Sequence, residues 1–371
     1  MSNVSPSRQS SWLPRLLGRW EARDVAPLVS LAVLVVFFAL AAPSFLRAAT
    51  LLAVFKQGSA LAIVAVGLTY VLICAEIDLA VGMTALWSAC LCGWLFQNWG
   101  WFLANWCGLR HVLAGAWVPR PPGTGPAEGA ALVAVLVIPL AASLALGLAS
   151  GLLTVWSRLP SFIITLAMMF IAEGMSRFLT KSATFKIPDL LSRLGNDVLD
   201  VGGWIGLPAG LRAWLMIPYS AVLAALVLLA GHVVLQHTRF GRYVYMTGGN
   251  REAARLAGVR TARIVVACLA LCALTAGLGG LLNAGRLTNA TLDQNKDLLL
   301  SAVACVVLGG TSLFGGEGGI GKTLIGVLTF TVLNVGLIQV NWINDLARQL
   351  LTGLVLLVAL VVNGVLAKGR S

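Results

Sequence analysis

The sequence has few charged and titratable residues. Only 11% of its 371 residues are charged, and it contains three histidines and four tyrosines. A soluble domain carries about a quarter charged residues on the surface that it presents to water. The chain also lacks a His/Asp/Ser set and paired carboxylates on one helix face, so the sequence predicts no catalytic centre of its own. These shortages argue against a water-soluble enzyme.

Apolar residues make up 58% of the chain and gather in long uninterrupted runs. A helix needs roughly 20 apolar residues to cross about 30 Å of hydrocarbon. The runs do not alternate as the strands of a membrane β-barrel do, so each is expected to be a helix. We predict an all-α integral membrane protein with about ten transmembrane helices, near residues 25–42, 51–74, 81–103, 129–156, 160–180, 214–234, 264–285, 298–311, 323–339 and 346–366.

The basic residues predict how the chain lies in the membrane, because Lys and Arg accumulate in cytoplasmic loops. The leader at 1–24 is basic, and the densest basic stretch is the loop at 235–263. An even number of spans returns the tail at 367–371 to the side of the leader. We therefore expect a transmembrane domain at 25–366 with both termini and the loop 235–263 in the cytoplasm. The chain has a net charge of +12, but most of its charges lie between apolar runs and form no broad basic face. We therefore interpret them as topology signals of a chain surrounded by membrane lipid, and we expect no nucleic-acid partner.

Two patterns that carry chemistry in other proteins have simpler explanations here. Residues 316–323, GEGGIGKT, fit a phosphate-binding loop, but they lie between two apolar spans and not between a buried strand and a soluble helix. We interpret them as a glycine-rich connection between helices, with a self-contained membrane nucleotide-binding enzyme as the remote alternative. Cys268 and Cys272 share a helix face without a histidine or third thiol, so we expect packing residues and no metal site.

Residues 239–263, RFGRYVYMTGGNREAARLAGVRTAR, contain a candidate short helix. Asn250 is a residue that favours the N-cap position, and Gly258 favours termination of the helix. Glu252 in the first turn and Arg255 near the last complement the helix dipole. Roughly two turns are not stable alone in water, so this helix requires a docking surface. An apolar patch is available for docking, formed by Ala253, Ala254, Leu256 and Ala257. From the residues alone, a basic loop resting on anionic lipid is an equal alternative.

This loop, followed by LGGLLNAGRLTNA and AVACVVLGGTSLFGGEGGIGKTLIGVL, resembles the carboxyl-terminal half of bacterial ABC-importer permeases of the ribose, xylose and galactose type. Upstream, EIDLAVG at 76–82 is similar to that family's G-x-IDLSVG element, and LPSFIITL at 159–166 is similar to its LPPFIATL element. The resemblance covers about residues 51–365. The sequence departs from the family pattern at Ala80, Ser161 and Lys322, and it carries an unusual outer insertion at 105–129.

The resemblance implies an ABC-importer permease bundle in a bacterial inner membrane, with no catalytic activity of its own. It implies a separate ATP-binding subunit that holds ATP and Mg, no cofactor in this chain, a periplasmic sugar-binding protein, and a second permease copy that is identical or paralogous. A branched-chain amino acid, a nucleoside or a furanosyl signal is the alternative cargo. The residues that would couple the permease to the ATPase are Gly249, Asn250, Glu252, Ala253, Ala254, Leu256 and Gly258.

Polar residues inside apolar spans are candidates for a solute path, because such residues are unfavourable in lipid. Hydrogen bonding between helices is the alternative role. The candidates are Gln57, Thr69, Asn283, Asn334 and Asn363. Glu173 and Arg177 stand four residues apart, and we expect them to neutralise each other.

Two segments that interrupt apolar runs, which we call breakers, lie at 76–82 and 315–321, and each is expected to lead into a helix rich in small residues. Paired interruptions of this kind favour an internal duplication with half-helices near the path.

Overall fold

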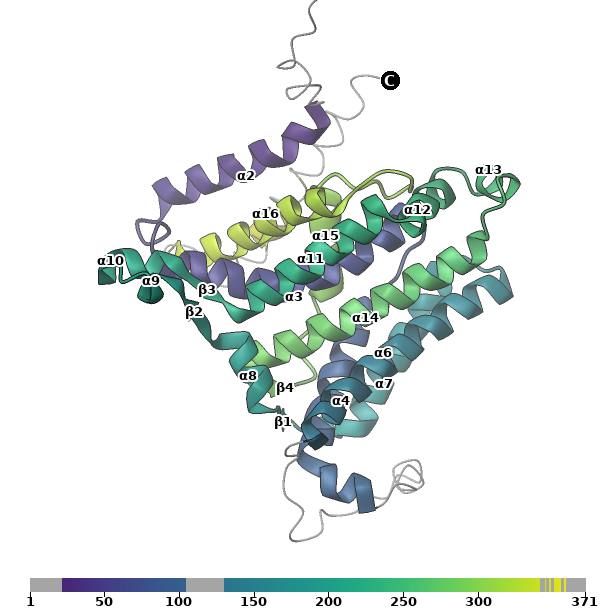
Figure 1. The fold of residues 1–371 in the computed structure, drawn as a ribbon, viewed down its shortest axis with the longest axis horizontal. Helices are drawn as coiled ribbons and strands as arrows, with labels where there is room; N and C mark the ends of the chain where they lie inside the picture. The colour runs from purple at the N-terminus through teal and green to yellow at the C-terminus, as the bar shows by residue number, and fades with distance from the viewer. Residues whose placement is uncertain are drawn as a thin grey trace, which may run out of the picture.

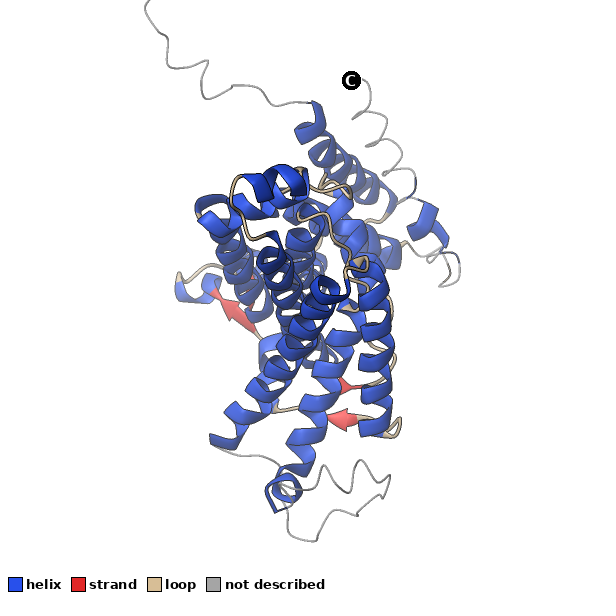
Figure 2. Cartoon of the chain, turned by 90° about the vertical axis from the view of Figure 1, so that its right-hand side faces the viewer, coloured by secondary structure: helices blue, strands red, loops and turns tan. Residues whose placement is uncertain are grey.

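The computed structural model describes residues 22–104 and 130–340, together with 344, 347, 350–354 and 357, and almost all of its regular structure is helical (Figure 2). The long helices are α2 (Ala22–Ala41), α3 (Ala48–Ile73), α4 (Val81–Ala104), α6 (Ala130–Ser157), α7 (Ser161–Thr180), α11 (Tyr219–His237), α14 (Thr261–Leu287) and α16 (Ile320–Gln339). The shorter ones are α8 (Asp189–Asn196), α9 (Val201–Trp204), α10 (Ala209–Arg212), the 3-10 helix η1 (Ala213–Leu215), α12 (Arg239–Gly249), α13 (Arg251–Leu256) and α15 (Leu298–Leu308).

Four short strands form two antiparallel pairs at loops. Strand β1 (Phe185–Lys186) pairs with β4 (Asn289–Ala290), and β2 (Val198–Asp200) pairs with β3 (Met216–Pro218). They lie at the opposite end of the bundle from α13, which protrudes at the upper right of Figure 1.

Helix α14 runs diagonally through the centre of the molecule (Figure 1) and packs against α3, α4, α6 and α8. Small residues allow this approach, as expected where lipid supplies no hydrophobic drive for helix association. A Cβ atom added to Gly147 of α6 would lie 2.7 Å from the backbone oxygen of Leu269, and one added to Gly280 of α14 would lie 2.1 Å from that of Ala85. Backbones therefore touch directly along the core of the bundle.

Six helices in the described part of the chain are long and apolar enough to cross a membrane, namely α3, α6, α7, α11, α14 and α16. The all-helical membrane fold is confirmed, whereas ten spans are not. The predicted span at 298–311 is wrong as a full crossing: α15 has 11 residues, or about 16 Å of helix, which is half the hydrocarbon thickness. The span expected from 214 begins at Tyr219 because Pro218 takes an extended conformation and ends strand β3.

Other predicted segments lie wholly or partly outside the described residues. These are the leader at 1–24, the insertion at 105–129, the last span at 346–366 with Asn363, and the tail at 367–371.

The breaker at 76–82 lets two helices begin side by side inside the bundle. After α3 ends, the chain extends past Asp78 before α4 starts at Val81. A Cβ atom at Gly82 would lie 3.1 Å from the backbone oxygen of Asn295 and 3.4 Å from the backbone nitrogen of Leu299, so the first turns of α4 and α15 are in contact. The second breaker, at 315–321, instead connects α15 to α16 near α12.

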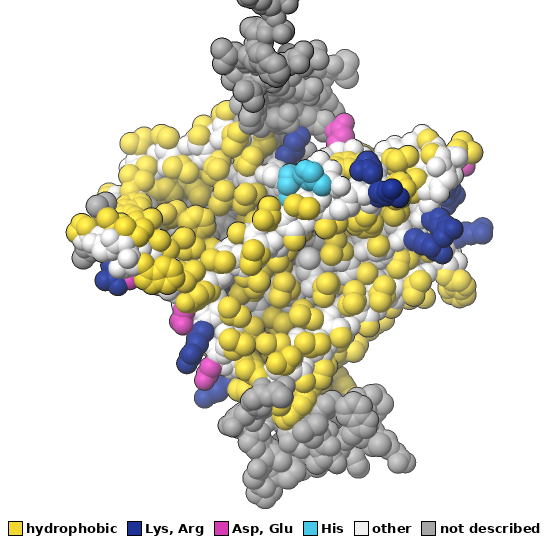
Figure 3. All heavy atoms as spheres, in the orientation of Figure 1, with side chains coloured by type: hydrophobic (Ala, Val, Ile, Leu, Met, Phe, Trp, Pro, Cys, Tyr) yellow, Lys and Arg dark blue, Asp and Glu magenta, His cyan; other side chains and the backbone are white. Residues whose placement is uncertain are grey.

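The outer surface of the bundle is apolar. In Figure 3 hydrophobic side chains cover most of the visible face, while Lys and Arg side chains gather near the α13 end. Helices α7 and α11 carry many of the exposed large side chains, whereas most of α3 and α14 is buried. This distribution fits a core of α3, α14 and α16 with α7 and α11 toward lipid.

Candidate functional site

The short helix predicted in the basic loop is present as α13, and both of its ends are closed by hydrogen bonds. The side chain of Asn250 accepts a 2.9 Å hydrogen bond from the backbone nitrogen of Ala253. At the other end Gly258 has a φ of +81°. The backbone nitrogen of Gly258 donates to the oxygen of Arg255 at 2.9 Å, and the backbone nitrogen of Val259 donates to the oxygen of Ala254 at 3.0 Å. This is a Schellman motif, which a residue with a Cβ atom would strain.

The two faces of α13 have different surroundings. Ala254 is 2% exposed and belongs to the core next to Val259, so its assignment to the docking patch is wrong: it fixes α13 to the bundle instead. Leu256 is 87% exposed, and Glu252 and Ala253 are exposed as well. An apolar side chain held out by a short rigid helix is typical of an anchor for a partner.

Helices α12 and α13 are joined to the ends of the transmembrane helices by direct contacts. The guanidinium of Arg251 forms an ion pair with the buried carboxylate of Glu76, just after α3. Gly248 of α12 lies against the oxygen of Ile73, the last residue of α3, and this oxygen accepts a 2.9 Å hydrogen bond from the nitrogen of Gly316. A force on α13 therefore reaches both the α3–α4 connection and the α15–α16 connection. The Glu76–Arg251 pair was not foreseen, although an acid in a breaker and a basic loop were both visible in the sequence.

A depression of about 370 Å³ adjoins this attachment and is lined partly by Glu76, Ile77, Phe162, Gly249 and Arg251. The hydroxyl of Ser161 accepts a hydrogen bond from the nitrogen of Ile77 at 3.0 Å, so the start of α7 is fastened to the same loop. Of the coupling residues named from the sequence, Gly249 and Asn250 line this depression, whereas Glu252, Ala253, Ala254, Leu256 and Gly258 lie outside its lining.

The glycine-rich connection has no free Thr hydroxyl to serve a phosphate. Thr323 is fully buried, and its Oγ1 lies 2.7 Å from Oγ1 of Thr69 and donates to the oxygen of Gly319 at 3.3 Å. Gly315 and Gly316 have φ values of +87° and +74° and make the turn before α16. The connection thus acts as a turn, as the sequence predicts.

A second site is a polar cavity of about 660 Å³ at the other end of α14. Gln57 of α3, Asn283 of α14 and Asn334 of α16 all line it, so three of the residues proposed for a solute path come together. Thr69 does not line the cavity. It is buried, it donates a hydrogen bond to the oxygen of Ala65 at 2.6 Å, and its hydroxyl contacts that of Thr323 on α16. Thr69 therefore has the alternative role, hydrogen bonding between helices. Glu173 and Arg177 also pair with each other, as predicted, at 2.7 Å.

Sequence reasoning missed the other polar residues of this cavity, which include Arg286, Gln294 and Asn295. The Nδ2 of Asn283 donates a 2.8 Å hydrogen bond to Oδ1 of Asn295, and Nη2 of Arg286 donates a 3.1 Å bond to Oδ1 of Asn283. At the rim Lys296 pairs with Asp293 and lowers the pKa of that carboxyl. The available signal was the run TNATLDQNKD, which is polar between two apolar segments.

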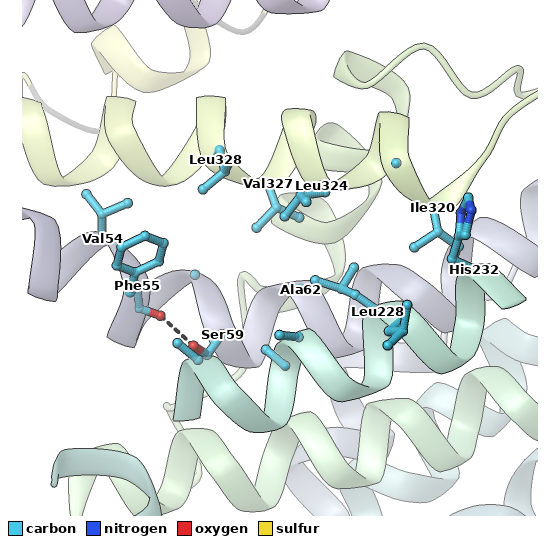
Figure 4. A pocket seen from close by; sticks show the side chains of 16 residues that line it. Val54, Phe55, Ser59, Ala62, Leu228, His232, Ile320, Leu324, Val327 and Leu328 are labelled. Atoms are coloured by element: carbon cyan, nitrogen blue, oxygen red, sulfur yellow. Dashed lines mark hydrogen bonds between the residues drawn. The ribbon is translucent and has the colours of Figure 1, made fainter. Parts of the chain in front are cut away.

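A third cavity, of about 380 Å³, lies between α3, α11 and α16 and is apolar. Figure 4 shows aliphatic side chains from all three helices facing it, with His232 at one end. Alanine residues of α11, such as Ala221, Ala224 and Ala225, line its wall. Apart from Ser59 and His232 this space is lined by apolar groups and is a poor site for a hydroxylated solute.

The comparisons with known proteins identify the scaffold that carries these sites. Residues 50–360 match the family described as "Branched-chain amino acid transport system / permease component". The chain belongs to this permease family. The permease is 32% identical to the ribose import permease protein of Escherichia coli (strain K12) over 91% of this chain and 92% of that one. It is also 32% identical to the ribose import permease protein of Bacillus subtilis (strain 168), over 92% of each chain.

The permease is 26% identical to the autoinducer 2 import system permease protein of Photorhabdus luminescens, over 92% of this chain and 90% of that one. No solved structure matches. The assignment to ABC-importer permeases and the multi-pass membrane character are confirmed.

Proposed function

We propose that the permease is the membrane subunit of an ATP-driven importer that takes up a monosaccharide by alternating access. The similarity to two ribose import permeases over nine-tenths of the chain carries this proposal. ATP and Mg bind to a separate ATP-binding subunit, a periplasmic sugar-binding protein delivers the solute, and a second permease copy completes the pore. The Mg–ATP chemistry belongs to the partner, and this chain requires no cofactor.

The end with α13 faces the cytoplasm in this proposal, so both termini are cytoplasmic and the polar cavity opens toward the periplasm. The support is the gathering of Lys and Arg at the α13 end. Docking of the ATP-binding subunit on Leu256 and its exposed neighbours moves α13, and the Glu76–Arg251 pair and the Gly248 contact pass the movement to the helices as a rigid-body shift.

The test uses proteoliposomes that contain the permease with its own ATP-binding subunit and binding protein. Labelled ribose, xylose, galactose, leucine and adenosine are offered with and without ATP inside. We expect accumulation of one of the three monosaccharides that requires ATP. Accumulation of leucine or adenosine alone would refute the sugar assignment while leaving the importer mechanism intact.

A second cargo class has support of its own. The description of the matching family names branched-chain amino acid transport, and the name of one relative gives autoinducer 2 as its cargo. The same mechanism with a branched-chain amino acid, a nucleoside or a furanosyl signal is the alternative. Leucine and adenosine in the panel test the first two, and labelled autoinducer 2, added to the panel, tests the third.

A further inference from the structure

The polar cavity contains buried amide groups without partners. Nδ2 of Asn295 and both Oε1 and Nε2 of Gln294 are shielded from solvent and make no hydrogen bond within the described residues. Asn295 is only 4% exposed. An unpaired buried amide costs about 1–3 kcal/mol, so native structures retain such groups where a ligand or water completes them.

A hydrogen-bonded chain fixes the direction of the Asn295 amide. Arg286 donates two hydrogen bonds, at 3.1 and 3.3 Å, to Oδ1 of Asn283. The amide nitrogen of Asn283 must then point away, and it donates to Oδ1 of Asn295 at 2.8 Å. The oxygen of Asn295 is thereby occupied, which leaves its two N–H donors for a further group. Arg286 and Asn283 are positioning residues in this arrangement.

The chemistry of the lining suits an uncharged solute with several hydroxyl groups. Carboxamides offer neutral donors and an acceptor, and hydroxyl groups can satisfy both. Two basic and two acidic residues line the cavity, so their formal charges balance: Asp293 and Lys296 pair with each other, Arg286 donates to Asn283, and Asp297 is exposed. Phe330, which is 7% exposed, adds an apolar wall against which the carbon face of a sugar can pack. The volume of about 660 Å³ lies within the range of small-molecule sites.

The same residues lie against two helices that begin inside the bundle. A Cβ atom built on Gly82, at the start of α4, would meet the backbone oxygen of Asn295 at 3.1 Å and the backbone nitrogen of Leu299, in the first turn of α15, at 3.4 Å. A solute held by Asn295 and Gln294 therefore lies beside the starts of two helices that begin inside the bundle.

We propose that Gln294 and Asn295 form a sugar-hydroxyl subsite in the wall of the translocation cavity, oriented by Asn283 and Arg286, and that this subsite contributes to solute selection by the permease itself. The inference rests on the proposed monosaccharide import and identifies residues of the permease that recognise the solute.

The test uses whichever monosaccharide the importer accumulates, together with the 2-deoxy and 3-deoxy analogues of that sugar. For ribose, it compares the uptake of ribose with that of 2-deoxyribose and 3-deoxyribose in the complete reconstituted importer, for the unaltered chain, Asn295→Leu and Gln294→Leu. Each variant loses hydrogen bonds to a hydroxyl group, so ribose uptake at low concentration should fall about tenfold. Uptake of the deoxyribose that lacks the contacted hydroxyl should change less than about twofold. Since all chains use the same binding protein, its own selectivity cancels in this comparison.

Two further measurements separate the subsite from folding. Gln97→Leu removes an equivalent amide on α4 whose Nε2 makes a 3.5 Å contact with the oxygen of Lys186, outside the cavity, and it should transport normally. Stimulation of ATP hydrolysis by the binding protein should persist in Asn295→Leu. Equal losses for ribose and both deoxyriboses, or unchanged ribose uptake, would overturn the subsite. Import of leucine and of no sugar would overturn both the proposed cargo and the subsite.

Discussion

Leu256 is the residue on which the coupling proposal depends most directly. Leu256 is 87% exposed on a helix whose two ends are capped, so its side chain is accessible to a partner. Asn250 caps the first turn through its side-chain oxygen, and backbone hydrogen bonds around Gly258 close the other end. The side chain therefore has a fixed direction and can fill a groove without further ordering.

Replacing Leu256 with Gln should lower binding of the ATP-binding subunit and ATP-dependent uptake about tenfold or more, because fully burying a leucine side chain contributes about 1.5–3 kcal/mol. Co-purification and uptake measure this effect. The variant should remain in the membrane with unchanged thermal stability. Leu46→Gln is the control, since Leu46 is 58% exposed just before α3, at the helix end opposite Ile73. Equal behaviour of the two variants would remove Leu256 from the interface.

The ion pair between Glu76 and Arg251 should show coupling in a double-mutant cycle. Glu76 is buried, so Arg251→Gln leaves its carboxylate without its partner and should destabilise the protein by about 1–3 kcal/mol. Adding Glu76→Gln should recover part of that loss, because no buried charge then remains. Thermal unfolding in detergent gives the four values. Additive effects would show that the two side chains do not stabilise each other.

At the scale of elements, the contact between α12 and α3 depends on one glycine and not on its neighbour. A Cβ atom on Gly248 would lie 1.7 Å from the oxygen of Ile73, whereas one on Gly249 would meet Cα of Gly316 at 4.0 Å, which is ordinary contact. Gly248→Ala should therefore displace α12 and lower the unfolding temperature by several degrees. Gly249→Ala should leave it within about a degree. A loss of the same size in both variants would contradict the close approach.

The sequence predicted the elements whose signals are local. The cap at Asn250, the stop at Gly258 and the Glu173–Arg177 pair depend on residues at most eight positions apart, and the structure shows all three. Apolar periodicity likewise indicated most of the long helices.

Features that depend on distant residues were not predictable. Leu298–Leu308 is apolar enough for a span, but the turn at 291–297 and the close packing beside Gly82 shorten it to a half-helix. The cavity joins Gln57, Asn283 and Asn334 from three helices, and the orientation of Asn295 follows from contacts that no single-sequence pattern encodes. Ala254 looked like a surface residue because periodicity does not say which face of a six-residue helix is buried.

For the molecule as a whole, orientation in the membrane is the most accessible test. We predict that a cysteine at Leu256→Cys reacts with a membrane-impermeant maleimide only after the inner membrane is opened, whereas Leu46→Cys reacts in intact spheroplasts. The described native cysteines are buried and give little background. Labelling in the reverse order would invert the topology and place α13 out of reach of any cytoplasmic ATPase.

The direct backbone contacts of α14 determine where the transporter can bend. Helices α3, α4 and α6 meet α14 through glycines, so sliding any of them would drive backbone atoms together. Helices α11 and α16 instead face each other and α3 across the apolar space near His232. Their glycine contacts with α3 involve side chains, Gly231 with Val66 and Gly58 with Thr331, whereas α16 meets the backbone of α15 at Gly326 and would move together with it. The four-helix core thus serves as a stiff frame, and we expect the gate to open by tilting of α11 and α16 against it.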